Sequence, residues 1–166
     1  MLSTIAEMDA MVAATLQFAR DETTTEVPRP TDVTALLQSI VDDMADAGMP
    51  VVMESASPIV NECRPNALKR AIRNLLDNAV KYGKAARTAI YTTPTAIEIT
   101  IDDEGLGIPA QELSRVFEPF YRADDSRSRD TGGLAVALSI VQAHDGELML
   151  ANRTEGGLRA TINLPR

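Results

Sequence analysis

An acidic residue continues an apolar strand face in the middle of the chain. The isoleucines of the segment 97–101 alternate with polar residues, so the two-residue period of a strand puts them on one face, with Asp103 next in the row. A carboxylate there is costly unless a hydrogen-bond donor meets it. Gly105 and Gly107 follow, and glycines allow a ligand to approach the backbone closely. A planar ligand with donor groups, such as adenine, would fit; the simpler interpretation is that Asp103 caps the turn that begins at Gly105.

A second polar cluster lies on a helix that the sequence predicts over residues 65–81. Asn74, Asn78 and Lys81 are four and three residues apart, which puts them in one stripe beside an apolar helix face. Amide oxygens suit a hydrated Mg²⁺ ion, which keeps several waters and takes few protein ligands, and an ammonium group can meet phosphate. Taken alone, the stripe also fits a solvated helix face.

A third segment combines aromatic, basic and glycine residues. Three of the six aromatic residues of the chain lie between positions 117 and 121 and indicate an anchor at the base of a loop. Arg122 and two further arginines add local positive charge to an acidic protein. Gly132 and Gly133 precede a helix predicted from Leu134, whose free N–H groups would favour phosphate. The alternative is a solvent loop over a small core.

The elements that must position these residues follow helix and strand patterns after position 30. The patterns predict helices over residues 31–47, 65–81 and 134–144, and strands over residues 51–54, 59–62, 88–92 and 95–103 and in two closing segments. In the last strand apolar residues alternate with polar ones, so one face of the sheet is covered. The predicted fold class is α+β: a two-layer sandwich with a mixed, mostly antiparallel sheet of about five strands, covered on one face by about three helices.

The N-terminal part follows a different pattern. Residues 1–22 predict a helix with a broad apolar stripe, and the polar run with two prolines that follows breaks the helix and indicates a hinge. The heptad-like repeat favours a bundle helix over a helix packed on its own domain. We place the boundary near Glu26, so residues 1–26 form a bundle helix and hinge, and residues 27–166 form the main domain.

Composition excludes several classes of protein. The chain has 166 residues, 45% hydrophobic and 24% charged, as expected for one globular domain with an appended element. No apolar run is long enough to cross a bilayer and no signal peptide opens the chain, so we expect a soluble, non-secreted chain without membrane contact. One cysteine and one histidine exclude an internal disulfide and a Cys/His zinc site. The net charge of −8 disfavours nucleic acid as a partner.

Taken together, the motifs resemble the ATP-binding catalytic domain of bacterial sensor histidine kinases, in the GHKL superfamily with type II topoisomerases and heat-shock chaperone ATPases. Residues 74–82 (Asn-Leu-Leu-Asp-Asn-Ala-Val-Lys-Tyr) resemble its N box, residues 103–107 (Asp-Glu-Gly-Leu-Gly) its G1 box, and residues 117–122 (Phe-Glu-Pro-Phe-Tyr-Arg) its F box. The resemblance covers residues 31–166. Residues 1–22 resemble the second helix of the dimerisation and phosphoacceptor bundle of the family.

This resemblance implies roles for individual residues. Asp103 would accept a hydrogen bond from the adenine amino group, and Asn78 would hold Mg²⁺. In hydrolytic relatives a glutamate four residues before the magnesium asparagine activates water; here that position is Asn74, which disfavours a dedicated ATP hydrolase. The resemblance extends the nucleotide site to Asn74, Lys81, Tyr82, Gly105, Gly107, Ile108, Phe117, Arg122, Gly132, Gly133 and Leu134.

The sequence departs from the family pattern at two places. The acceptor histidine belongs on the first bundle helix, whereas the single histidine here, His144, comes late in the chain, so we expect neither a catalytic His144 nor autophosphorylation of this chain by itself. The G2 box of the family has spaced glycines, whereas here Gly132 and Gly133 run directly into Leu134. A short glycine-bearing segment is therefore missing, by deletion or by omission from the sequence.

The resemblance implies a catalytic fragment of a two-component sensor kinase. It would transfer the γ-phosphoryl group of Mg-ATP to a histidine on a bundle helix of the same kinase, in cis or in trans within a homodimer, for relay to a response-regulator aspartate. The fragment would lie in the cytoplasm and its parent in the bacterial inner membrane. The alternatives are a nucleotide-binding or protein-interaction module without kinase activity, because the G2 region is incomplete, and a kinase of protein serine residues as in anti-sigma factors.

Overall fold

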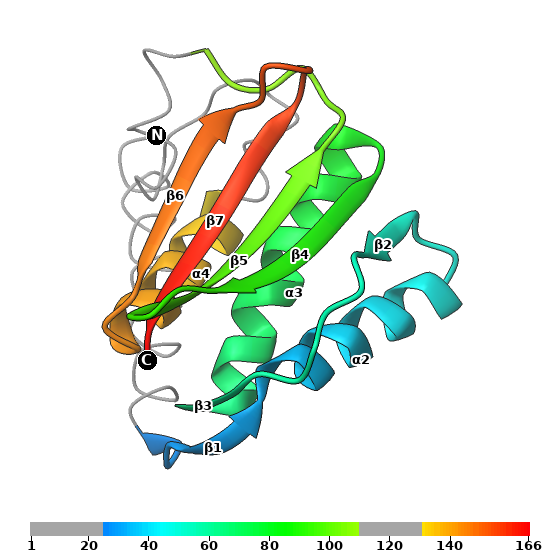
Figure 1. The fold of residues 1–166 in the computed structure, drawn as a ribbon. Helices are drawn as coiled ribbons and strands as arrows, with labels where there is room; N and C mark the ends of the chain where they lie inside the picture. The colour runs from blue at the N-terminus through cyan, green and yellow to red at the C-terminus, as the bar shows by residue number, and fades with distance from the viewer. Residues whose placement is uncertain (1–24, 110–130) are drawn as a thin grey trace, which may run out of the picture.

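A mixed five-stranded sheet with three helices on one face forms the body of the protein (Figure 1). The computed structural model describes residues 25–109 and 131–166. The sheet has the order β2-β4-β5-β7-β6; β2 is parallel to β4 and all other neighbours are antiparallel. The strands are β2 (Val51–Met53), β4 (Ala86–Thr92), β5 (Ala96–Asp103), β6 (Glu147–Asn152) and β7 (Leu158–Pro165).

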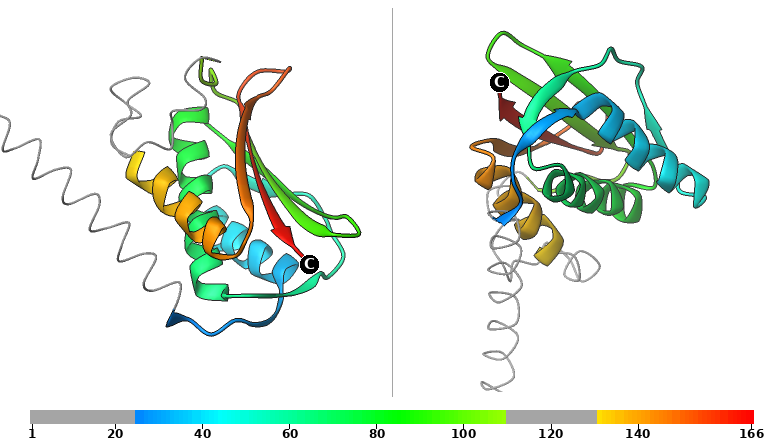
Figure 2. Two further views of the ribbon diagram at one scale, coloured as in Figure 1. Left: turned by 90° about the vertical axis from the view of Figure 1, so that its left-hand side faces the viewer. Right: turned by 90° about the horizontal axis from the view of Figure 1, so that it is seen from below.

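The helices α2 (Val33–Asp46), α3 (Pro65–Gly83) and α4 (Thr131–Ala143) cover the same face of the sheet, and no helix of the described residues covers the other face (Figure 2). Two short strands, β1 (Arg29–Asp32) and β3 (Val60–Cys63), pair antiparallel as a separate ribbon. The predicted α+β sandwich with a mixed, mostly antiparallel sheet is therefore confirmed. No helix in the described ranges has the length and apolar character that crossing a bilayer requires.

The core lies between the sheet and the helices. Ile97, Ile99 and Ile101 on the inner face of β5 are at most 2% exposed, and Ile99 is paired with Ile90 on one side and Ile162 on the other. Strict alternation in β5 and β7 puts this apolar row on one face of the sheet, where the helices bury it.

Helix α3 is the longest of the described elements and carries the predicted site residues Asn74, Asn78, Lys81 and Tyr82. Pro65 opens its first turn, where the missing N–H costs nothing, and an apolar face with Leu68 and Ile72 fully buried packs it on the sheet. The helix ends at Gly83, and Lys84 then turns the chain with a φ of 68°. The backbone N–H of Ala85 donates to the carbonyl oxygen of Gly83 at 2.8 Å, which closes a tight turn into β4.

The structure differs from the sequence prediction mainly at the ends of elements. The sequence pattern does not predict strand β1, because Pro28 and Pro30 indicate a break in the chain. Pro30 is tolerated because β1 is an edge strand of a two-stranded ribbon. Helix α4 begins at Thr131, three residues before the predicted start at Leu134, and so includes both adjacent glycines. The helix predicted over residues 1–22 lies outside the described residues, as do Phe117 and Arg122.

Candidate nucleotide site

A pocket of about 380 Å³ lies between α3 and the start of α4. Its size falls in the range of small-molecule sites. The pocket brings together four of the residues predicted from the sequence: Asn74, Asn78 and Lys81 from the polar stripe of α3, and Gly133 of α4. The other lining residues are Met49, Asp77 and Val80. The stripe of α3 is therefore not merely a solvated helix face.

Asn78 carries the most informative atom of this pocket. Its Oδ1 is buried and has no hydrogen-bond partner among the described residues. A buried acceptor without a partner costs about 1–3 kcal/mol, so such atoms are rare unless a ligand, an ion or a water completes them. The oxygen suits a hydrated magnesium ion, which prefers oxygen ligands. Within residues 25–109 and 131–166 no group of three or more acidic, histidine or cysteine side chains could form a metal site.

Asp103 is the buried acid that the alternation in β5 predicted. It is 4% exposed, and its Oδ1 accepts hydrogen bonds from the backbone N–H groups of Gly105 and Leu158, each at 3.0 Å. The bond from Gly105 shows that the turn-capping interpretation is correct. It does not exclude a ligand, because both of these hydrogen bonds go to Oδ1.

Asp103 and Asn78 meet at a second, narrower pocket of about 20 Å³. Leu134 of α4 also lines this pocket, together with apolar residues of β5, β6, β7 and α3: Leu75, Ala79, Ile101, Leu150, Leu158 and Ala160. The carboxylate of Asp103, the amide of Asn78 and the apolar side chains thus lie together around this narrow pocket. A cavity of this volume has room for about one water molecule, so contact between Asp103 and a flat ligand with an N–H donor stays a prediction.

The two glycines that follow Asp103 are explained by contacts inside the protein. A Cβ atom on Gly105 would lie 2.6 Å from the carbonyl oxygen of Tyr82, at the end of α3. Gly107 has a φ of 76°, and a Cβ there would overlap the amide group of Asn152. The glycines therefore let this loop lie against α3 and β6, and contact with a ligand stays a prediction for both.

The remaining predicted residues lie around this loop and the two helix ends. Lys81 is exposed in the last turn of α3, where a positive charge is favourable, and half-buried Tyr82 follows it. Ile108 is 2% exposed and belongs to the core. Gly132 and Gly133 lie in the first turn of α4.

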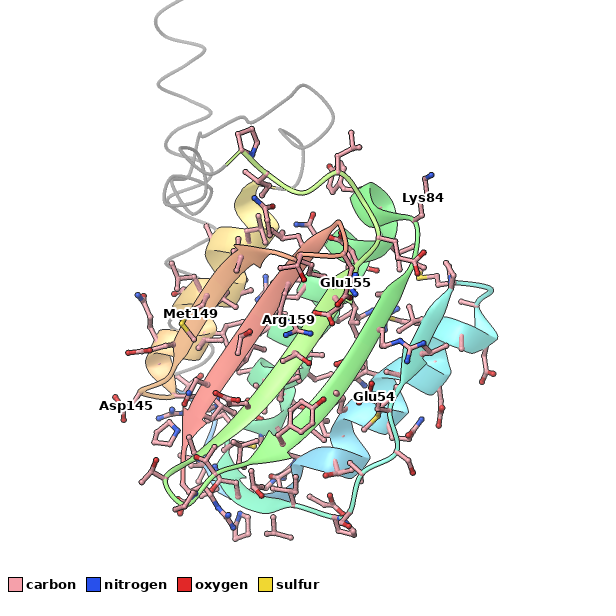
Figure 3. The ribbon with its side chains drawn as sticks, turned by 45° about the horizontal axis from the view of Figure 1, so that its top comes forward. Glu54, Lys84, Asp145, Met149, Glu155 and Arg159 are labelled. Carbon is pink, nitrogen blue, oxygen red and sulfur yellow. The ribbon has the colours of Figure 1, made fainter. Side chains whose placement is uncertain are left out.

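Sequence reasoning missed the charged groups on the open side of the sheet behind Asp103. Arg159 forms two hydrogen bonds with Asp102, at 2.6 and 2.8 Å, which raise the pKa of Arg159, and Arg153 lies 3.7 Å from the same carboxylate. Figure 3 shows Glu155 at the turn between β6 and β7 and Arg159 on the open face of the sheet. The sequence alone shows that acidic and basic residues occupy outward positions of β5 and β7. The strand register of the structure then places Asp102 opposite Arg159.

His144 uses both ring nitrogens within the protein. Nδ1 lies 2.8 Å from the carbonyl oxygen of Ile140, to which it donates, and Nε2 accepts from the backbone N–H of Arg64 at 3.1 Å. Arg64 also donates to the carbonyl oxygens of Glu26 and Ala143, each at 3.0 Å. The histidine thus joins the end of α4 to the start of α3, a structural role.

The fold and the pocket define a class of protein: an α+β sandwich domain with a pocket between two helices and a buried acid close by. Comparison with protein families makes this specific, because residues 63–166 match the family described as "Histidine kinase-, DNA gyrase B-, and HSP90-like ATPase". The chain belongs to this family, as the ATP-binding catalytic domain of a sensor histidine kinase.

Individual relatives agree with this assignment. The chain is 40% identical over 161 residues to the sensor histidine kinase GtrS of Pseudomonas aeruginosa, which covers 96% of this chain and 34% of that protein. It is 32% identical over 172 residues to the sensor-type histidine kinase PrrB of Mycobacterium tuberculosis, covering 99% of this chain and 38% of the relative. The chain therefore spans little more than a third of these relatives.

Solved structures show the same fold. The crystal structure of the ATP-binding domain of PrrB from Mycobacterium tuberculosis matches with a TM-score of 0.70 at 30% identity, covering 83% of this chain and 96% of that one. Full-length ShkA in complex with AMPPNP matches with a TM-score of 0.75 at 19% identity over 95% of this chain and 36% of that one. At that identity the second match concerns the fold alone.

Proposed function

We propose that this domain binds Mg-ATP in the pocket between α3 and α4 and transfers its γ-phosphoryl group to a histidine on a bundle helix that is absent from this chain. The observation that carries the proposal is the buried, unpartnered Oδ1 of Asn78, a residue that lines both the main pocket and the narrow pocket beside Asp103. An acceptor left unpaired at that position is best explained by a ligand that completes it.

Each residue of the site has a task in this proposal. Asp103 accepts a hydrogen bond from the adenine amino group through its second oxygen, while the backbone N–H groups of Gly105 and Leu158 hold the first. Asn78 would hold Mg²⁺ through Oδ1, and Lys81, at the mouth of the pocket, faces the phosphates as a point charge. When bound, Mg²⁺ would neutralise negative charge on the phosphate groups during transfer.

Catalysis by this chain then consists of positioning and charge stabilisation. Phosphoryl transfer needs little covalent chemistry from the protein, so alignment of the nucleotide with an incoming histidine is the main contribution. Asn74 lies in the pocket where a hydrolase would place a general base, and an amide cannot take a proton from water. This favours transfer to a protein nucleophile over hydrolysis.

The partners and location in this proposal extend beyond the chain. Residues 1–26 belong to the dimerisation bundle and hinge, the acceptor histidine lies on another bundle helix of the same kinase, and the phosphoryl group passes to a response regulator. The domain works in the cytoplasm as part of a kinase anchored in the bacterial inner membrane. Sensor kinases among the relatives, including GtrS, CpxA and PrrB, support this proposal.

Calorimetric titration of ATP with and without Mg²⁺ tests the binding step. We expect Asn78→Ala to abolish the gain in affinity that Mg²⁺ gives, while Asn66→Ala, an exposed asparagine on the same helix, leaves it unchanged. An equal loss in both variants, or no saturable binding by folded wild-type protein, would refute the site.

A transfer assay tests the reaction itself. The purified chain is mixed with [γ-³²P]ATP, Mg²⁺ and a separately purified helical hairpin that carries the acceptor histidine of a sensor kinase. Acid-labile, base-stable label on the hairpin supports a histidine kinase. Binding without transfer would instead support the nucleotide-binding module without kinase activity.

A further inference from the structure

We infer that Asn152 and Arg153, two adjacent residues at the end of β6, are positioning residues for nucleotide binding, because they hold the two ends of the loop 103–108. The inference rests on the proposed role of Asp103 in reading the adenine base. Neither residue lines the main pocket or the narrow pocket that holds Asp103. Their action is therefore indirect, through the loop.

Arg153 holds the first end of the loop. Its guanidinium group donates to the carbonyl oxygen of Asp103 at 2.7 Å and to that of Gly156 at 3.2 Å, and it forms an ion pair with Glu155 at 2.8 Å. The ion pair with Asp102 adds a further restraint, and the Arg153 side chain is only 20% exposed. A partly buried guanidinium with four acceptors around it has one orientation, so it fixes the backbone of Asp103.

The turn that carries Arg153 also fixes the carboxylate of Asp103. Gly157 packs so closely on Asp103 that a Cβ atom there would overlap the carbonyl group of Asp103. The next residue, Leu158, donates its N–H to Oδ1. The β6–β7 turn therefore holds Asp103 at its carbonyl oxygen and at one carboxylate oxygen, which leaves Oδ2 in a defined direction.

Asn152 holds the other end of the loop. Its Oδ1 accepts from the backbone N–H of Ile108 at 2.9 Å, and its Nδ2 donates to the carbonyl oxygen of Ile108 at 2.6 Å. The Asn152 side chain thus makes with the backbone of Ile108 the two hydrogen bonds that a residue of a neighbouring strand would make. Between these ends Glu104 donates its N–H to the carbonyl oxygen of Gly83 at 3.0 Å, and Leu106 at the tip is completely exposed.

Arg159 offers a matched control for Arg153. Both guanidinium groups interact with Asp102, but of the two only Arg153 has a hydrogen bond to Asp103 among the interactions of the described residues. Replacing either arginine by methionine removes one positive charge and one partner of Asp102. A difference between the two variants therefore reports the contact with Asp103.

The test compares ATP with purine riboside 5′-triphosphate, which lacks the 6-amino group that Asp103 would read. Dissociation constants of both nucleotides are measured calorimetrically with Mg²⁺ for the wild-type chain, Arg153→Met, Arg159→Met and Asn152→Ala. A hydrogen bond to a charged acceptor predicts a wild-type preference for ATP of about ten- to a hundredfold. We expect Arg153→Met to lower this preference about fivefold or more and Arg159→Met to change it less than about twofold.

The outcomes separate this inference from the proposed function. A wild-type preference for ATP that survives in Arg153→Met overturns the inference and leaves the role of Asp103 intact. Equal affinity of the wild-type chain for both nucleotides refutes the role of Asp103 itself. A general loss of affinity with unchanged preference means that Arg153 serves only the fold, which also overturns the inference.

Asn152→Ala keeps the inference testable if Arg153→Met does not fold. It removes both hydrogen bonds to Ile108 from a residue in an exposed position of β6. We expect its affinity for ATP to fall about fivefold or more while its thermal midpoint stays near that of the wild type. Wild-type affinity in a folded Asn152→Ala would show that the second end of the loop needs no such restraint.

Discussion

Replacement of Glu26 should destabilise α3, although Glu26 lies 40 residues before Asn66 in the first turn of that helix. The N-cap position of α3 is Arg64, which provides no side-chain hydrogen bond to the helix. Glu26 takes this role instead: its Oε2 accepts from the N–H of Asn66 and its Oε1 from that of Ala67, each at 2.9 Å. The carboxylate also lies at the positive end of the helix dipole.

The magnitude follows from these two bonds. Loss of an N-cap costs about 0.5–2 kcal/mol, and loss of a negative charge at a helix N-terminus about 0.3–1 kcal/mol. One of the two bonds is exposed and water can replace it, so we expect Glu26→Ala to lower the free energy of unfolding by about 1–1.5 kcal/mol. For a chain of this length that corresponds to a fall in Tm of about 2–6 °C.

Urea and thermal unfolding of wild-type, Glu26→Ala and Glu62→Ala chains measure the effect. Glu62 is an exposed glutamate on β3 and serves as the control. Amide hydrogen exchange locates the effect, since the amides of Asn66 and Ala67 should exchange faster in Glu26→Ala alone. Equal stability of the two variants, or unchanged exchange at these two amides, would refute the capping role.

Three further predictions concern the end of α3 and the single cysteine. Lys84→Gly should raise the free energy of unfolding by about 1 kcal/mol in urea unfolding, because a φ of 68° strains a side chain but not a glycine, whereas a loss of stability would contradict this. Gly83→Ala should destabilise the chain and weaken ATP binding, because the new Cβ atom would overlap the side chain of Asp103. This loss is expected although alanine is a better helix former than glycine. Unchanged stability and affinity would refute the contact. Burial raises the pKa of the Cys63 thiol, so its reaction with Ellman's reagent should be slow at pH 8 in the folded protein and fast in urea. The rate in the folded protein should also keep rising above the pH at which the rate for an ordinary thiol becomes constant. Rapid labelling of the folded protein at pH 8 would contradict this prediction.

The sequence predicted features of the site that depend on short-range periodicity. The alternation in β5 placed Asp103 on the buried face, and the spacing along α3 placed Asn74, Asn78 and Lys81 on one side. Both patterns repeat within one element, where backbone geometry alone decides which residues share a face. The buried position of Asp103 and the common side of the three α3 residues could therefore be inferred before any contact was known.

Contacts between distant segments could not be predicted in this way. Asn152 binds Ile108 across 44 residues, and Arg153 binds Asp103 across 50. Such pairs depend on which strand ends lie together, and the sheet order β2-β4-β5-β7-β6 is not written in any local pattern. The strand β1 escaped prediction for the same reason, since its pairing with β3 outweighs the local tendency of Pro30 to break structure.

The glycines and the acid of the loop 103–108 show why motif residues alone do not establish a ligand. Gly105 is explained by the carbonyl oxygen of Tyr82, Gly107 by its φ and by Asn152, and one oxygen of Asp103 by two backbone N–H groups. Each of these features would be present in a protein that binds nothing. The argument for a nucleotide therefore depends on what the described residues leave unsatisfied, which is the buried Oδ1 of Asn78. Because an unpaired buried polar atom is costly, its position on a residue that lines the pocket is stronger physical evidence for a ligand than the motif residues themselves.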